Sequence, residues 1–476
     1  MSTQPNIILI HTDQHRGDCL SINQHPVVQT PNLDHLAHAG AQFTSAYSEC
    51  PTCIPARHTL LTGMEPQATG VVGFETKARI ERADSTLPEL LKRGGYQTIS
   101  VGRGMHQYPG HAHYGFEIVD GDPFKEHYSR FHKLSIPGGN HMGKVNWPHG
   151  TTHGLSPNSM CARPWPHDEE FHETNFSVNK AIEHLYKRDK DRPLFMSVGF
   201  IAPHPPLAPP RDYYDRYMQM DLPEPVIGDW AERPKNDGRG LSPGAGKQVL
   251  EGDFMRQAQA AYYALINHVD DQLNLLFEQI DQHLDDTYIF FISDHGEMLG
   301  DHYFCRKALP YEASSHIPFI LKGPDIPEGS RIEAPVGLQD ILPTCCKIAG
   351  IDTPAHVTGH SILPLARRED DAESRSWIHG EHAPMGDQHP GVHFLTDGKC
   401  KFIWFNDGTE QFFDLENDPR ECKNLINDSK YAKEVILWRK RLIEKLADRP
   451  ERFSDGAKLT PSKNYKNANS VATVDA

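Results

Sequence analysis

Runs of apolar residues that are too short for helices recur along the chain and predict buried strands. The clearest are residues 6–10 (NIILI), 193–200 (PLFMSVGF) and 287–293 (TYIFFIS), and a weaker one covers 97–101. Continuous apolar runs of this length are typical of strands that are buried on both faces of a parallel sheet. We therefore expect these segments to form the centre of the fold.

Segments with helical features lie between the predicted strands. Residues 31–43 carry Pro31 and Gly40, which favour a helix start and a helix stop, and residues 85–96 have the same design. The longest helix is expected over 254–280, where leucine and valine side chains recur at helical spacing. Strands that alternate with helices predict an α/β fold with a large, mostly parallel or mixed sheet between helical layers.

Two stretches break this alternation. Residues 104–170 are rich in His, Gly and Pro and show little periodicity, which indicates substrate-facing loops. After about residue 370 the pattern changes to short strands with turns, followed by a closing helix near 429–447. We predict a catalytic domain over 1–370, a smaller C-terminal α+β domain over 371–455 and a polar tail over 456–476.

Charge and cysteine content narrow the class of protein. The 476 residues include 48 basic and 64 acidic side chains, and the formal charge of −16 argues against non-specific nucleic-acid binding. No apolar run approaches the roughly 18 residues that a membrane span needs. The nine cysteines are scattered and odd in number, and the N-terminal apolar run lacks the basic region of a signal peptide. A cytoplasmic location is therefore the expectation, unless a leader has been removed.

The first candidate for chemistry is the segment from Cys53 to Arg57 (CIPAR). A cysteine just before a proline and an apolar, helix-like run indicates a nucleophile at a helix N-terminus, where the helix dipole and Arg57 would both favour an anion. A structural buried cysteine is the plainer interpretation. Cys50 and Cys53 also form a CxxC pair, which leaves a redox function as an alternative.

Polar side chains follow two of the predicted strands and suggest a metal site. Asp13 and Gln14 come after the first strand, and Asp294 and His295 come after the strand at 287–293. Ligands bind at the carboxyl ends of the strands in open α/β sheets. Carboxylate and amide oxygens favour Ca²⁺ or Mg²⁺, and an imidazole also admits Mn²⁺. Taken singly, each Asp is more often a turn or cap residue.

Three further residues are weaker candidates. Lys307 lies in the segment after His295, where an ammonium group beside a metal site would hold an anionic oxygen. His106 and His204 follow strand-like segments, and each is a candidate general acid or anion-binding donor. The alternative for each of the three is a solvated or structural side chain.

Together these motifs resemble the type I sulfatases of the alkaline phosphatase superfamily. The resemblance is carried by Cys53-x-Pro55-x-Arg57 with the LLTG that follows it, and by further segments in consistent order between about residues 5 and 447. These segments are PNIILIHTDQ, TPNLDHLAHAG, SVGFIAPHPPLAPP, SDHGEMLGDHYFCRK, LQDILPTCCKIAG and FFDLENDPRECKNL. The resemblance implies an alkaline phosphatase-like fold.

The resemblance also implies a cofactor and a reaction. A formylglycine-generating enzyme would oxidise Cys53 to formylglycine, and one divalent cation, usually Ca²⁺, would be surrounded by Asp13, Gln14, the modified Cys53, Asp294 and His295. One hydroxyl of the hydrated aldehyde would attack the sulfur of a sulfate monoester on a carbohydrate or aryl group, and collapse of the diol would expel sulfate. Arg57 would orient the nucleophile, and Lys307 and His204 would hold sulfate oxygens, one of them protonating the leaving group.

The chain departs from the family pattern at two positions. Arg103 stands where the family usually has lysine, with one extra residue before His106, and Ile54 is bulkier than the small residue common after the cysteine. An arginine is a planar fork where lysine is a point charge, so the substrate geometry would differ. A phosphonate monoester or phosphodiester hydrolase of the same superfamily, often with Mn²⁺, is the main alternative function. A non-catalytic anion-binding protein is a further one.

Several side chains in the 104–170 region would suit a sulfated saccharide. Aromatic and basic residues are common in sugar-binding sites, and four of them are candidates here: Tyr108, Trp147, Arg163 and Trp165. Lid packing is the alternative interpretation of the aromatic side chains.

Overall fold

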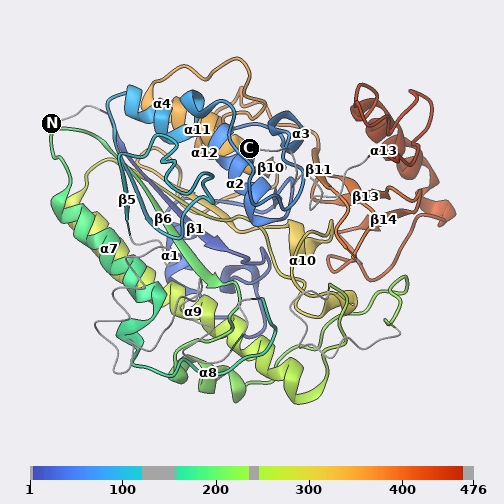
Figure 1. The fold of residues 1–476 in the computed structure, drawn as a ribbon, viewed down its shortest axis with the longest axis horizontal. Coiled ribbons are helices and arrows are strands. Elements are labelled where there is room, and N and C mark those ends of the chain that lie inside the picture. The colour runs from blue at the N-terminus through green and yellow to red at the C-terminus, as the bar shows by residue number, and fades with distance from the viewer. Residues whose placement is uncertain (1–3, 121–154, 156–157, 235–245, 387, 465–476) are drawn as a thin grey trace.

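A mixed eight-stranded sheet forms the centre of the molecule (Figure 1). The computed structural model describes residues 4–120, 155, 158–234, 246–386 and 388–464. The strand order is β5-β4-β6-β1-β7-β8-β2-β9. The first five strands in this order are mutually parallel, whereas β8 is antiparallel to both of its neighbours. The strands are β1 (Asn6–Asp13), β2 (Ala41–Phe43), β4 (Gln97–Gly102), β5 (Ile118–Asp120), β6 (Leu194–Pro203), β7 (Thr287–Ser293), β8 (Phe319–Lys322) and β9 (Ser330–Ile332).

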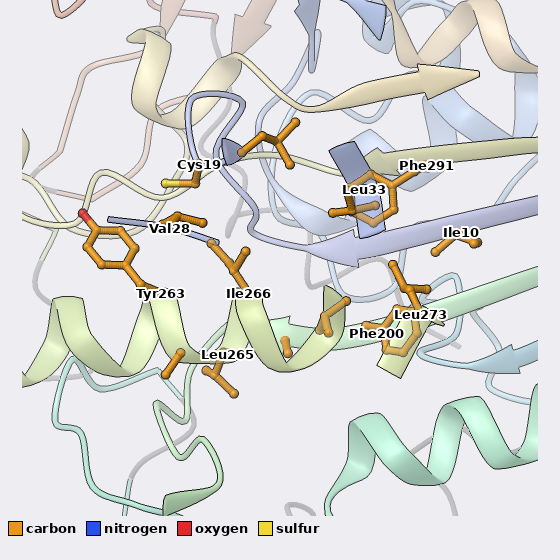
Figure 2. Close-up of a cluster of buried hydrophobic side chains, with 14 of the residues drawn as sticks. Ile10, Cys19, Val28, Leu33, Phe200, Tyr263, Leu265, Ile266, Leu273 and Phe291 are labelled. Atoms are coloured by element: carbon orange, nitrogen blue, oxygen red, sulfur yellow. The ribbon is translucent and has the colours of Figure 1, made fainter. Parts of the chain in front are cut away.

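Helices cover both faces of this sheet because its strands are apolar on both sides. In β1, Ile8 and Ile10 point to one helical layer and Ile7 and Leu9 to the other, and all four are fully buried. The first layer contains α1 (Pro31–His38), α7 (Glu173–Lys187), α8 (Arg211–Met218) and α9 (Gly252–His283), and Figure 2 shows its contact with the sheet. The second contains α2 (Cys53–Thr62), α4 (Leu87–Arg93), α11 (Ile341–Ala349) and α12 (Leu363–Arg367).

The predicted sheet with helical layers is therefore confirmed, with one correction in the N-terminal region. The segment 31–43 is not a single helix, because α1 ends at His38 and residues 41–43 form β2. Gly40 allows this turn, since a Cβ on it would lie 2.5 Å from the carbonyl oxygen of Leu321 in β8. The loop region expected over 104–170 contains β5, and its residues 121–154 lie outside the described part of the chain.

A separate antiparallel sheet follows the large sheet and confirms the expected α+β C-terminal unit (Figure 1). One face of this sheet packs on Val435, Trp438 and Leu442 of its closing helix, and the other face packs on Met298 and Tyr311. The elements are β11 (Ile378–His382), β12 (Val392–Thr396), β13 (Cys400–Phe405), β14 (Glu410–Asp414) and α13 (Ala432–Lys445). The domain boundaries at residues 370 and 455 stay predictions.

Short elements connect these units. They are β3 (Ala46–Tyr47) paired with β10 (Val336–Gly337), α3 (Pro66–Thr69) and α10 (Glu312–Ser315). Among the described residues, no helix is both long and apolar enough to cross a bilayer.

The parallel arrangement of β4, β6, β1 and β7 decides where the functional side chains lie. These four strands are neighbours in the sheet, so their carboxyl ends meet at one edge. The residues that end or follow them in the sequence are Arg103, His204, Asp13 and Asp294, respectively.

Candidate active site

The carboxyl edge of the sheet brings together four groups that can bind a metal. Asp13, Cys53, Asp294 and His295 are all buried, and their ligand atoms lie within 4.8 Å of one another. The Cys53 Sγ atom is 3.2 Å from His295 Nε2, which is itself 3.7 Å from Asp13 Oδ1 and 3.6 Å from Asp294 Oδ1. These donors fit one divalent cation, because carboxylate oxygens suit Ca²⁺, Mg²⁺ or Mn²⁺ and the imidazole nitrogen also admits Mn²⁺.

The imidazole of His295 is oriented for this role by the backbone. Its Nδ1 atom lies 2.9 Å from the carbonyl oxygen of Gly296, so Nδ1 carries the proton and the lone pair of Nε2 faces the cluster. Burial lowers the pKa of His295 to about 4. The ring is therefore neutral near pH 7, which is the form that binds metals.

Arg57 binds one oxygen of each carboxylate, those of Asp13 and Asp294, and leaves the other oxygen of each facing the cluster. Its Nη2 atom lies 3.1 Å from Asp13 Oδ2 and 3.0 Å from Asp294 Oδ2, while the Oδ1 atoms face His295. Arg57 lies in the second turn of α2, which starts at Cys53, and only 1% of the arginine is exposed. The helix α2 therefore supplies both the candidate nucleophile, Cys53, and the Arg57 guanidinium that holds the two carboxylates in place.

Lys307 also contacts residues of this cluster. Its Nζ atom lies 2.8 Å from Gln14 Oε1, 3.0 Å from Cys53 Sγ and 3.9 Å from Asp13 Oδ1. Burial opposes ionisation of Asp13, but His204, Lys307 and Arg57 hold the pKa of its carboxyl well below the usual range. Asp13 is therefore ionised and carries the negative charge that a divalent cation needs.

The cysteine itself is a poor nucleophile as a thiol. Burial raises the pKa of Cys53 to about 12, with Asp13 adding to the rise, and burial also raises the pKa of Cys50. All nine cysteines are free thiols in this structure. Reactive redox cysteines have lowered pKa values, so the geometry does not favour the CxxC redox interpretation.

Three more of the candidate residues lie at the same edge. Arg103 donates from Nε to Asp13 Oδ2 at 3.2 Å and from Nη2 to His106 Nε2 at 2.6 Å. The backbone N–H of His204 donates to the Asp13 carbonyl at 3.1 Å, and burial and then Lys307 lower the pKa of the His204 ring. The structure thus groups the residues predicted for the catalytic and metal site, and it places Arg103 among them, while their individual roles stay predictions.

The side chains suggested for saccharide binding are not equivalent. Trp165 is buried and packs with Leu155 and Ala208, so it belongs to an apolar cluster and does not form an exposed platform. Tyr108 is half-buried with the Arg79 guanidinium 5.4 Å from its ring centroid, and Arg163 is exposed. Trp147 lies outside the described residues.

Sequence reasoning missed one residue at the site, Glu297. It is fully buried and accepts a hydrogen bond from Gln14 Nε2. The signal was present in the SDHGE segment, where a glutamate stands two residues after His295 and is followed by the apolar pair Met298 and Leu299.

The sequence model of the sulfatase family, described as "Sulfatase", matches residues 5–351. The chain belongs to the sulfatase family. This sulfatase is 37% identical over 473 residues to an arylsulfatase of Clostridium perfringens (strain 13 / Type A). The alignment covers 96% of this chain and 97% of the relative. A model described as "N-sulphoglucosamine sulphohydrolase, C-terminal" also matches residues 300–449.

Solved structures agree with this assignment at the level of the fold. The phosphonate monoester hydrolase of Agrobacterium radiobacter superposes with a TM-score of 0.79 and 25% identity, over 93% of this chain and 96% of that one. A protein solved with its substrate D-glucosamine-2-N,6-O-disulfate gives a TM-score of 0.75 and 22% identity, over 93% and 98% of the two chains. The resemblance to the sulfatases of the alkaline phosphatase superfamily is confirmed.

Proposed function

We propose that this sulfatase hydrolyses a sulfate monoester of an aryl or saccharide alcohol in the buried site around Cys53. The observation that carries the proposal is the grouping of Cys53 with Asp13, Asp294 and His295 within 4.8 Å. Hydrolysis of aryl sulfates is the activity named for the Clostridium relative, which aligns along nearly the whole chain. A disulfated glucosamine is the substrate in the second solved structure, and it motivates the saccharide alternative.

Two groups complete the site in the active enzyme that we propose. Formylglycine at position 53, made from Cys53 by a formylglycine-generating enzyme, supplies a hydrated aldehyde whose hydroxyl is the nucleophile. A divalent cation, for which Ca²⁺ is the first candidate, lowers the pKa of such a hydroxyl and offsets charge on the transferred group. The residues that would hold this cation are Asp13, Gln14, Asp294 and His295.

Several protein side chains are already positioned for this reaction. Arg57 keeps the Oδ1 atoms of Asp13 and Asp294 directed at the cation position. The ammonium of Lys307 is 3.0 Å from Cys53 Sγ, so it can donate a hydrogen bond to a sulfate oxygen beside the nucleophile. Fixed positive groups in a buried site stabilise the charge that spreads over the oxygens of the transferred group. Lys307, or His204 once its ring is protonated, would supply the proton to the departing alcohol.

Initial rates on matched aryl esters test the substrate class. We expect kcat/KM for an aryl sulfate to exceed that for the corresponding aryl phosphonate monoester by more than about tenfold, a difference of roughly 1.4 kcal/mol in transition-state stabilisation. A sulfated glucosamine, assayed by release of sulfate, separates the saccharide from the aryl preference. A faster rate on the phosphonate would instead support the second candidate function, which the fold of the Agrobacterium hydrolase motivates.

Removal of divalent metal should abolish the activity. A cation held by the Oδ1 atoms of Asp13 and Asp294, which face His295, would lower the pKa of the nucleophilic hydroxyl, and chelation removes this effect. We expect dialysis against a chelator to lower kcat by at least about 10³-fold and added Ca²⁺ or Mn²⁺ to restore it. Circular dichroism controls for unfolding, and metal analysis checks the depletion. Full turnover by enzyme shown to be metal-free would exclude the metal mechanism.

A further inference from the structure

Glu297 is a buried carboxylate whose two oxygens have different partners. Oε1 accepts the backbone N–H groups of Leu299, at 2.8 Å, and of Arg306. Oε2 accepts a hydrogen bond from the side-chain Nε2 of Gln14. The glutamate is fully buried. It therefore connects the loop that carries Lys307 with the residue that follows β1.

The amide of Gln14 lies between two groups of opposite character. On one side, Lys307 offers only hydrogen-bond donors, and its Nζ atom is 2.8 Å from Gln14 Oε1. On the other side, the Glu297 carboxylate accepts from Nε2. A 180° flip of the Gln14 side-chain amide would place its NH₂ group beside the Lys307 ammonium, donor facing donor. It would also place its carbonyl oxygen beside the Glu297 carboxylate, acceptor facing acceptor. The two neighbours therefore select one orientation.

The backbone of Gln14 is fixed independently of this amide. The residue has a φ of 75°, its N–H donates to Asp294 Oδ1 at 3.1 Å, and its carbonyl oxygen accepts from the Tyr262 hydroxyl at 2.7 Å. The contacts of Glu297 thus decide the direction of the side-chain amide and not the course of the chain.

We propose that Glu297 is a positioning residue that holds the carbonyl oxygen of Gln14 toward the cation position and toward Lys307. The inference deepens the proposed function and rests on it for the place of the cation. Metal ligands are commonly oriented by an outer partner, and loss of such a partner lowers metal affinity by about 10- to 100-fold. Glu297 has the geometry of such a partner, and the same carboxylate also fixes the backbone next to Lys307.

The substitution Glu297→Gln tests this role with almost no change of shape. The remaining oxygen is required by the N–H groups of Leu299 and Arg306, so the new NH₂ must face Gln14 and turn its amide over. We expect the affinity of the purified protein for Ca²⁺ and for Mn²⁺, each added alone and measured by competition with an indicator chelator, to fall about 10- to 100-fold.

A reciprocal exchange provides the rescue. In the double variant Glu297→Gln with Gln14→Glu, the new carboxylate at position 14 accepts from the NH₂ at position 297 and still offers oxygen to Lys307 and to the cation. We expect the double variant to bind metal at least about tenfold more tightly than the two single effects combined would predict. Gln14→Glu alone sets two carboxylates against each other and should also bind metal weakly.

Glu49→Gln is the matched control. Glu49 is also buried, and its two oxygens accept the backbone N–H groups of Gln339 and Leu338, each at 3.1 Å; neither partner belongs to the metal cluster. We expect this variant to lose thermal stability with metal affinity unchanged.

The outcomes separate this inference from the proposed function. Wild-type metal affinity in Glu297→Gln, or a folded double variant without recovery, overturns the positioning role. Should Glu297→Gln fail to fold, a folded double variant with restored affinity still supports it. Wild-type protein that binds metal but hydrolyses no sulfate ester refutes the proposed function and leaves the metal-binding result intact.

Discussion

Cys53→Ala is expected to lower kcat/KM for a sulfate ester by about 10⁴-fold or more, because it removes the side chain from which the nucleophile is made. The fold should survive, since Cys53 is small and the N-cap residue of α2, Thr52, makes no side-chain capping bond that the substitution could disturb. The measurement is steady-state kinetics on an aryl sulfate, with circular dichroism and thermal unfolding on the same samples.

Cys50→Ala is the matched control for this variant. Cys50 is also buried and lies three residues before Cys53, and it makes none of the contacts that define the metal cluster. We expect this control to keep its activity. Mass spectrometry of the tryptic peptide that ends at Arg57 should show loss of sulfur from Cys53 when a formylglycine-generating enzyme is co-expressed. Full turnover by protein that retains the Cys53 thiol would refute the proposed chemistry.

Arg57→Leu is expected to lower both stability and activity. The substitution leaves Asp13 and Asp294 as neighbouring buried carboxylates without the guanidinium that bridges them at 3.1 and 3.0 Å. Breaking a buried ion pair from one side costs about 3–5 kcal/mol, and we expect the free energy of unfolding of metal-depleted protein to fall by that amount. With metal present, kcat/KM should fall by at least about 10³-fold, because the carboxylates lose their fixed direction.

Two further variants serve as controls for Arg57→Leu. Arg57→Lys restores a charge but not a planar fork that reaches both carboxylates, so we expect partial recovery of stability and less of activity. Arg449→Leu breaks another buried pair, in which Arg449 Nη1 and Nη2 each lie 2.9 Å from an oxygen of Glu381. That variant should be destabilised without a change in metal affinity. Equal metal affinity in Arg57→Leu and wild-type protein would contradict the role given to Arg57.

The grouping of Asp13, Cys53, Asp294 and His295 could be predicted because it follows from local sequence and sheet topology. Asp13 and Asp294 follow apolar runs that become neighbouring parallel strands, β1 and β7, so their side chains meet at the same edge. Cys53 and Arg57 are one helical turn apart, and a helix start predicts their common direction. The relation of Cys53 to Arg57 lies within one short segment, whereas that of Asp13 to Asp294 follows from the rule that the carboxyl ends of parallel strands meet at one edge of a sheet.

Other contacts could not be predicted because each joins side chains from distant parts of the chain. These contacts are the ion pair of Arg57 with Asp13, the hydrogen bond from Arg103 to Asp13 and the hydrogen bond between Gln14 and Glu297. The two residues of each pair are separated by 44, 90 and 283 positions, respectively. For Trp165 the sequence left saccharide binding and lid packing open, and its burial against Leu155 and Ala208 favours packing.

The sequence by itself determined the four central parallel strands β1, β4, β6 and β7, the positions of five helices (α1, α2, α4, α9 and α13), the family and the residue types that gather at the carboxyl edge of the sheet. The tertiary structure decided which oxygen of each carboxylate faces the cation position, which way the Gln14 amide points, and that α1 stops early so that β2 can pair with β8. Apolar patterns and signature motifs are written in consecutive residues. The direction of a buried polar group depends on partners that become neighbours only when the chain folds.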